Sequence, residues 1–355
     1  MSNTVQYRCP NCGGDISFSP SKQGYECEYC MSFFTQQQIE DVYSDLENQD
    51  LSQNVEETQS QNEFAEHNNL YVCNSCGAEI IADEQTSATF CCYCHNPVTL
   101  KGRLSGDFKP NRIMPFNIDK NQAESLFKKW CSKKRFTPSS FNTSKTLEKM
   151  TGLYVPFWLA DCKTNSHIDG LGKRISTWSD SKYNYTKTDE YHFVRDAKIN
   201  FNGIPVDGEK KIDDALMEAI EPFDYSKLKP FSMSYLTGFY ADKYDIGKAD
   251  ALPKVKQRAM DSALNIVKND THYDVLIPTN KNIDILKTDW EYTLMPVWFL
   301  NYKYQDKFYT FVVNGQSGKV AGVLPLSKSK LFAFGVISAI LITIIAYLIG
   351  GLLLW

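Results

Sequence analysis

Eight of the eleven cysteines fall into four C-x2-C pairs, and fourteen residues separate the first pair from the second in each half. Two such turns on neighbouring hairpins can bring four thiolates to one ion, with Zn–S distances near ~2.3 Å. The spacing therefore predicts two zinc ions, each held by four cysteines. The predicted ligands are Cys9, Cys12, Cys27 and Cys30 for one ion, and Cys73, Cys76, Cys91 and Cys94 for the other.

The two cysteine sets form an internal repeat. Every ligand of the first set recurs 64 residues later, and Tyr7 and Gly13 recur as Tyr71 and Gly77. Glycine at this position suits a tight turn whose N–H groups point at sulfur. Such short units cannot bury a sufficient core, so we expect metal binding to fold them. Four thiolates leave no open coordination position, which predicts structural sites rather than catalytic ones.

Other uses of these cysteines agree less well with the sequence than zinc binding does. Iron also accepts four thiolates, but the short paired spacing favours zinc. Disulfides are disfavoured because the N-terminus does not resemble an export signal, which points to a reducing cytoplasm. Cys92 could replace Cys91 as a ligand, but the 64-residue register favours Cys91. His95 is read as a bystander because four thiolates already complete the shell.

Residues 331–355 contain no charged side chain and predict a transmembrane helix. A helix of this length spans about 37 Å, enough to cross a ~30 Å hydrocarbon core. Lys328 and Lys330 precede it and no basic residue follows it. The positive-inside bias then predicts a single-pass, tail-anchored protein of the cell membrane whose N-terminal domains are cytoplasmic.

The sequence outside the cysteine pairs and the apolar run divides into segments that would position them. Residues 1–34 and 70–100 are the predicted zinc ribbons. Residues 35–69 carry nine acidic residues and no Lys or Arg, which predicts a flexible acidic linker with a short helix around residues 39–46. Residues 101–327 have a globular composition and predict a cytoplasmic α+β module.

An amphipathic helix begins this module. Asp119 and Gln122 resemble a capping box. An apolar stripe follows at helical spacing, which makes Cys131 a core thiol: Ala123, Leu126, Phe127, Trp130 and Cys131. A basic cluster covers the rest of the helix and its end: Lys128, Lys129, Lys133, Lys134 and Arg135. These charges complement the helix C-terminus; the alternative is a phosphate contact with a lipid headgroup or nucleic acid.

The module carries a second internal repeat. The run LYVPFWLADCK at 153–163 resembles TLMPVWFLNYK at 293–303, and both contain Pro-x-Trp. Each run follows an amphipathic helix, the second of which begins near Asp250. We infer a duplicated helix-plus-antiparallel-sheet module, in which the aromatic residues are core packing rather than a cofactor site.

The sequence predicts no enzyme. The run GLGKR at 170–174 and the run DEYH at 189–192 resemble fragments of ATPase motifs. A phosphate loop requires Gly where His167 stands and Ser or Thr where Arg174 stands. Hydrolase, zinc-protease and dinucleotide fingerprints are also absent from the sequence.

Several features of the chain occur together in one protein family. They are the tandem ribbons, the Pro-x-Trp repeats, the terminal apolar helix, YLTGFYADKYD at 235–245 and VNGQSGKVAG at 313–322. The chain resembles the membrane-anchored TFIIB-type zinc-ribbon proteins of Gram-positive bacteria, often labelled primosomal replication-factor or helicase-like. The resemblance covers nearly the whole chain, although this chain lacks the ATPase motifs that a helicase requires.

The resemblance implies an adaptor at the membrane. Members of this family are often encoded beside SPFH-domain and PspA-like membrane-stress proteins, which are therefore the expected partners. We expect the ribbons to act as recognition heads and the terminal helix to fix the assembly to the bilayer. The alternative is a membrane-tethered nucleic-acid-binding or regulatory protein, although the net charge of −4 gives no general attraction to nucleic acid.

Overall fold

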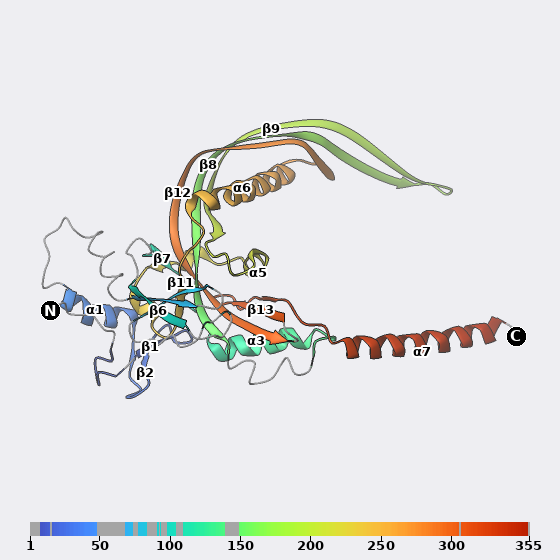
Figure 1. Cartoon of the computed structure of the whole chain (residues 1–355). Helices are drawn as coiled ribbons and strands as arrows, with labels where there is room; N and C mark the ends of the chain where they lie inside the picture. The colour runs from blue at the N-terminus through green and yellow to red at the C-terminus, as the bar shows by residue number, and fades with distance from the viewer. Residues whose placement is uncertain are drawn as a thin grey trace.

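The structure, a computed structural model, has a mixed α+β fold, as the sequence predicts. It describes residues 8–14, 16–47, 68–73, 77–83, 91, 93, 98–103, 109–138, 149–304 and 307–353. A three-stranded sheet lies near the N-terminus, and a sheet of eleven strands forms the body. A long apolar helix projects from the body at the C-terminal end of the chain (Figure 1).

The small sheet contains β1 (Ile16–Ser19), β2 (Gly24–Cys27) and β3 (Phe33–Phe34), paired antiparallel in that order. Helix α1 (Gln36–Glu47) follows directly. It forms the first part of the predicted acidic linker, and its Ile39 is fully buried in the core. Residues 48–67 of that predicted linker lie outside the described residues.

The large sheet runs in the order β10-β7-β12-β8-β11-β5-β4-β6, and β9, β13 and β14 attach beside it. Its strands are β4 (Asn68–Cys73), β5 (Glu79–Asp83), β6 (Val98–Arg103), β7 (Arg112–Ile113), β8 (Thr151–Ser179), β9 (Asn184–Asp207), β10 (Lys229–Pro230), β11 (Tyr240–Asp242), β12 (Val275–Tyr304), β13 (Lys307–Asn314) and β14 (Val320–Gly322). The remaining elements are α3 (Lys120–Ser132), α5 (Asp214–Ile220), η3 (Tyr225–Lys227), η4 (Met233–Leu236), α6 (Lys248–Asp270) and α7 (Lys328–Leu353).

Three of these strands form a curved arm. Strand β8 pairs antiparallel with β12 on one side and with β9 on the other. The three strands arch away from the body, and α6 packs inside the curve (Figure 1). A stripe of small and β-branched residues lets α6 approach the sheet closely: Ala251, Val255, Ala259, Ala263 and Val267 are all buried.

Helix α3 has the predicted capping box. The Gln122 N–H donates to Asp119 Oδ1 over 2.8 Å, and the Asp119 N–H donates to Gln122 Oε1 over 3.0 Å. Ala123, Phe127 and Cys131 are buried on one face. Cys131 is therefore a core thiol, and burial raises its pKa to about 12.

The α+β module repeats one arrangement twice. The order β7-α3-β8-β9 recurs as β11-α6-β12-β13. The short strand of each copy pairs in parallel with the long strand of the other: Ile113 lies opposite Leu294, and Ala241 lies opposite Tyr154. The two copies are thus interlocked rather than placed side by side.

The two Pro-x-Trp tryptophans hold this interlock. The Nε1–H of Trp158 donates to the Ile246 carbonyl over 2.8 Å, and that of Trp298 donates to the Ile118 carbonyl over 2.8 Å. Ile118 and Ile246 each stand two residues before a helix, α3 and α6 respectively. Each tryptophan therefore fixes the start of the helix that belongs to the other copy, which is a structural role.

Two glycines occupy equivalent positions in the two copies of the arrangement. Gly208 donates to the Pro156 carbonyl over 2.9 Å, and Gly315 donates to the Pro296 carbonyl over 2.8 Å. The carbonyl of each glycine in turn accepts from two N–H groups just before α6 or α3. A Cβ on Gly315 would lie 2.6 Å from the Phe116 ring, whereas a Cβ on Gly208 would lie 3.2 Å from its nearest atoms.

Helix α7 is attached to the body at its first turns. Lys330 Nζ donates to the Thr137 carbonyl over 2.8 Å, and the rings of Phe334 and Phe136 meet edge to face at 5.4 Å. Within the described residues, α7 is the one helix long and apolar enough to cross a membrane, over Lys328–Tyr347. This agrees with the predicted span at 331–355.

The glycine pair predicts unequal effects of one added methyl group. Gly315→Ala should destabilise the protein by about 1–3 kcal/mol, because Phe116 is enclosed and cannot move away freely. Gly208→Ala should cost less, because its contacts are wider. Urea denaturation in detergent, followed by tryptophan fluorescence, measures both. Equal stability of the two variants would contradict the tighter packing around Gly315.

Candidate metal centre

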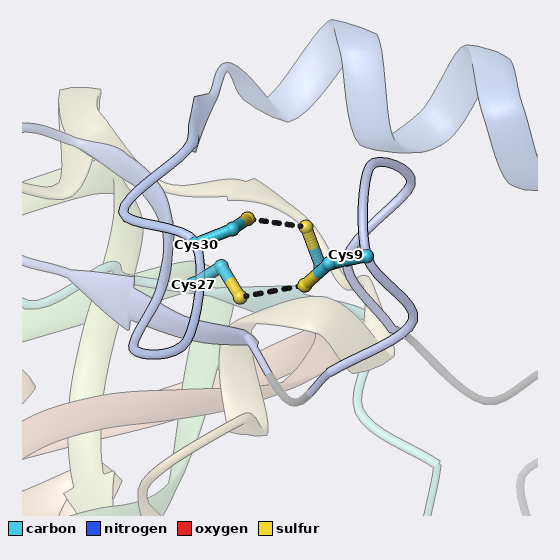
Figure 2. A group of neighbouring side chains, drawn as sticks. Cys9, Cys27 and Cys30 are labelled. Atoms are coloured by element: carbon cyan, nitrogen blue, oxygen red, sulfur yellow. Dashed lines mark hydrogen bonds between the residues drawn. The ribbon is translucent and has the colours of Figure 1, made fainter.

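Four cysteines converge beside the small sheet. The Sγ atoms of Cys9, Cys12, Cys27 and Cys30 all lie within 4.8 Å of one another, and Figure 2 shows side chains of the set facing each other. Two of the Sγ–Sγ distances are 3.4 and 3.5 Å. A tetrahedral zinc site with ~2.3 Å bonds separates its sulfurs by about 3.8 Å. The four side chains therefore fit zinc and form one four-cysteine site.

The backbone explains why the thiols converge. The Gly13 N–H donates to the Cys9 carbonyl over 2.8 Å, and the Cys9 N–H donates to the Gly14 carbonyl over 2.7 Å. At the other C-x2-C turn, the Met31 N–H donates to the Cys27 carbonyl over 3.0 Å. Gly13 has φ +71° and Met31 has φ +58°. Both turns thus need a left-handed residue directly after the second cysteine, and glycine adopts that conformation without strain.

Hydrogen bonds set the protonation of the two exposed thiols. The Ser32 hydroxyl, 3.1 Å from Cys30 Sγ, and the Ser32 N–H lower the pKa of Cys30 to about 6. The Gly14 N–H lowers the pKa of Cys12, but the thiols of Cys30 and Cys27 outweigh it and raise that pKa to about 12. The metal-free set therefore retains protons near neutral pH. Zinc must displace them, so binding weakens as the solution is acidified.

The second cysteine set is described in part. Cys73 and Cys91 are both fully buried. The other two predicted ligands, the rival ligand and the bystander lie outside the described residues: Cys76, Cys94, Cys92 and His95. The structure therefore shows one complete four-cysteine site, and the second ion stays a prediction.

The backbone around Gly77, beside the second cysteine set, repeats the backbone around Gly13. The Gly77 N–H donates to the Cys73 carbonyl over 2.8 Å, and the Cys73 N–H donates to the Ala78 carbonyl over 2.9 Å. Gly77 has φ +74°, close to the value at Gly13. The Tyr93 N–H points at Cys91 Sγ over 3.4 Å, as expected beside a thiolate ligand. The 64-residue sequence repeat is thus also a repeat of backbone geometry.

The first ribbon packs on the body through residues 233–239. The Tyr25 hydroxyl lies 2.7 Å from Ser234 Oγ in a buried hydrogen bond. The ring of Phe18 meets the ring of Tyr235 edge to face at 5.4 Å. The Phe18 N–H also donates to the Thr237 carbonyl over 3.4 Å. The first ribbon is therefore fixed against the module, and a flexible tether does not determine its position.

The described residues around the second cysteine set pack on the next residues of the same stretch. In strand β5, Ile81 pairs with Ala241 of β11. Lys243 Nζ lies 2.9 Å from Glu79 Oε2, and the Tyr93 hydroxyl donates to Asp242. Burial raises the pKa of Asp242 well above its ordinary value. We call residues 235–245 the junction segment, because they contact the first ribbon, the described residues around the second cysteine set and strand β8.

On the sequence alone, the junction segment is a marker of the family and has no assigned structural role. The available signal was its mixture of four aromatic residues with charged ones, since aromatic and acidic side chains buried together need specific partners. The identity of those partners depends on contacts between residues far apart in the chain, so the sequence alone could not supply them.

His167 belongs to a small cluster with two carboxylates. Its Nδ1 lies 2.6 Å from Asp196 and its Nε2 lies 3.3 Å from Asp169. The Asp196 hydrogen bond, with a smaller contribution from Asp169, raises the pKa of His167. The group lies exposed on β8 and β9 and links neighbouring strands.

Zinc content tests both cysteine sets. We expect about two zinc ions per chain, one in each four-cysteine site. The pair Cys9→Ser and Cys12→Ser should remove one ion, and Cys73→Ser with Cys76→Ser should remove the other. Metal analysis of purified protein gives the count, and Cys131→Ser is the matched control because that thiol is a core residue. A wild-type content of one ion, unchanged by the second pair of substitutions, would show that the second set holds no zinc.

Comparison with known proteins agrees with this site. The sequence model of the reverse gyrase zinc finger matches residues 1–53, which supports a zinc ribbon there. The TFIIB-type assignment stays a prediction. No solved structure matches the chain. The uncharacterized protein YdjG of Bacillus subtilis (strain 168) is 31% identical over 337 residues, covering 93% of this chain and 93% of YdjG. This chain therefore belongs to the same family as YdjG.

Proposed function

We propose that this protein is a membrane-anchored adaptor without enzymatic activity. Helix α7 lies in the cell membrane, and the zinc ribbons and α+β module form one cytoplasmic binding body. The observation that carries the proposal is the junction segment, which packs the first ribbon and strand β5 onto a module that continues directly into α7. Two structural zinc ions stabilise the ribbons, whose closed coordination shells offer no position for a substrate.

Contacts at the first turns of α7 support a fixed orientation of the body relative to the membrane. Ser327 donates to the Phe136 carbonyl over 2.7 Å, and Lys330 and Phe334 contact Thr137 and Phe136. The segment after α3 thus holds the first turns of α7. A body held in this way lies close to the bilayer surface and presents a defined face to partners.

The basic cluster supports the cytoplasmic orientation. Its five side chains are exposed at the end of α3: Lys128, Lys129, Lys133, Lys134 and Arg135. The chain passes from this cluster to Phe136 and Thr137, which contact the root of α7. The charges therefore lie near the point where α7 would enter the bilayer. Lysine and arginine at that level favour the cytoplasmic side and attract anionic headgroups.

The partners we propose are SPFH-domain and PspA-like membrane proteins. This part of the proposal rests on the family resemblance. The zinc ribbons and the junction segment offer a folded surface, and the acidic stretch at 35–69 offers charge for a basic partner.

Removal of the anchor gives a direct test of localisation. A chain ending at Ser327 should move from the membrane fraction to the soluble fraction, because it lacks the apolar span. Fractionation with alkaline carbonate washing measures the change, and the full chain is the control. Membrane association of the shortened chain would contradict anchoring by α7.

The adaptor role is tested on intact membranes. Crosslinking and purification of the full chain should recover specific protein partners, and Cys9→Ser with Cys12→Ser should reduce their yield because the first ribbon unfolds. Cys131→Ser should leave the yield unchanged. If the full chain recovers no cytoplasmic or membrane protein above the level of an untagged strain, the adaptor role is wrong.

A second candidate function is nucleic-acid binding, favoured by the basic cluster. Binding through phosphates should weaken steeply as salt rises, and replacing Lys133, Lys134 and Arg135 by Gln should flatten that dependence. Fluorescence anisotropy with labelled DNA and RNA measures both effects. A lack of affinity at low salt would remove this candidate and leave the lipid phosphates as the anion that the cluster faces.

A further inference from the structure

At its far end the arm contains two strands rather than three. Pairing between β12 and β8 begins at Val275, opposite Lys173. Beyond that point β8 and β9 continue as a two-stranded ribbon, from Arg174 opposite Asp189 to Ser179 opposite Asn184. We call residues 174–188 the hairpin tip, and all of them are exposed. A two-stranded hairpin is marginally stable in water, so its surface chemistry needs an explanation.

Aromatic side chains cover this tip. Trp178 is 53% exposed, Tyr183 65% and Tyr185 39%. Trp178 and Tyr185 are cross-strand partners whose rings stack at 5.5 Å, and Tyr183 meets Tyr185 at 6.3 Å. The group is therefore a preformed aromatic surface rather than three independent side chains.

The turn holds this aromatic surface in place. Asp180 accepts from the N–H groups of Lys182 and Tyr183 over 2.7 and 2.8 Å, and from the Tyr185 hydroxyl over 2.9 Å. Asp180 is the one carboxylate within residues 174–188, where Arg174, Lys182 and Lys187 supply three positive charges. Asp189, the cross-strand partner of Arg174, lies 2.9 Å from Lys187, and Asp274 accepts from the Ile175 N–H. The charges at this end of the arm therefore balance, and the aromatic rings are what distinguish it.

The tip and the membrane helix project to the same side of the body. Figure 1 shows the β8–β9 hairpin curving over α6 and extending in the direction in which α7 leaves the module. Strand β9 has 24 residues, and at ~3.3 Å per residue its curved path is about 80 Å long. The arm is therefore long enough to reach the level of α7, as Figure 1 shows.

We propose that the hairpin tip contacts the headgroup region of the bilayer that holds α7. Trp and Tyr are enriched at that level because their rings combine an apolar body with a polar group. Lys182 in the turn can also reach a lipid phosphate. The inference rests on the proposed membrane anchoring by α7, and it gives the body a second contact with the same surface.

Quenching by lipid tests this contact. The full chain is reconstituted into phosphatidylcholine–phosphatidylglycerol vesicles, with and without bromine near the glycerol end of the acyl chains. The difference in fluorescence emission between the wild-type protein and the Trp178→Phe variant reports Trp178 alone. We expect brominated lipid to quench that difference signal and the vesicles to shift it to shorter wavelength. Trp178 is exposed, so the substitution should leave the fold intact, which circular dichroism checks.

The matched control is Trp290→Phe. Trp290 lies at the base of the arm, where its ring meets Trp158 at 6.1 Å, so brominated lipid should not quench its difference signal. Flotation of the vesicles reports anchoring by α7 independently. Floating protein with unquenched Trp178 would overturn the tip contact and leave the anchor standing, whereas protein that does not float would overturn both. Quenching in phosphatidylcholine alone would support the contact and assign it to the aromatic group rather than to charge.

Discussion

The antiparallel pairing of β8 with β12 is the constraint on which the rest of the structure depends. These strands carry the two Pro-x-Trp runs, so their register brings Trp158 and Trp298 to opposite ends of one shared core. Each tryptophan then donates a hydrogen bond to a carbonyl two residues before the helix of the other copy. Neither copy can keep its helix in place without the other, which makes the duplicated module a single cooperative unit.

This interlock also positions the four-cysteine site and the strands beside the second cysteine set. Strand β11 pairs with β8 on one side and with β5 on the other, while the residues just before it contact the first ribbon. The junction segment therefore connects the core to the first ribbon and to the strand that follows Cys73. The place of the first ribbon is set by these contacts with the body.

The sequence predicts the local parts of this molecule well because their signals are local. Cysteine spacing gave the convergence of Cys9 with Cys30, Asp119 and Gln122 gave the start of α3, and the uncharged run gave α7. The interlock could not be predicted from the sequence. Strand β7 has two residues, so its parallel pairing with β12 leaves no periodic pattern in the sequence. The buried Ile39 was hidden for a similar reason: its acidic, polar neighbours indicate a solvated segment, and tertiary packing overrides that composition.

The arm has no obvious use in holding the fold together. The core lies where β8, β12 and the ribbon strands meet, yet β8 and β9 continue far beyond it and end in a tip that buries nothing. Ordering such a hairpin costs conformational entropy that its own contacts scarcely offset. An exposed cluster of stacked aromatic rings and lysines is therefore best explained by a surface outside the chain. If α7 lies in a bilayer, that surface is already present on the side toward which the arm extends.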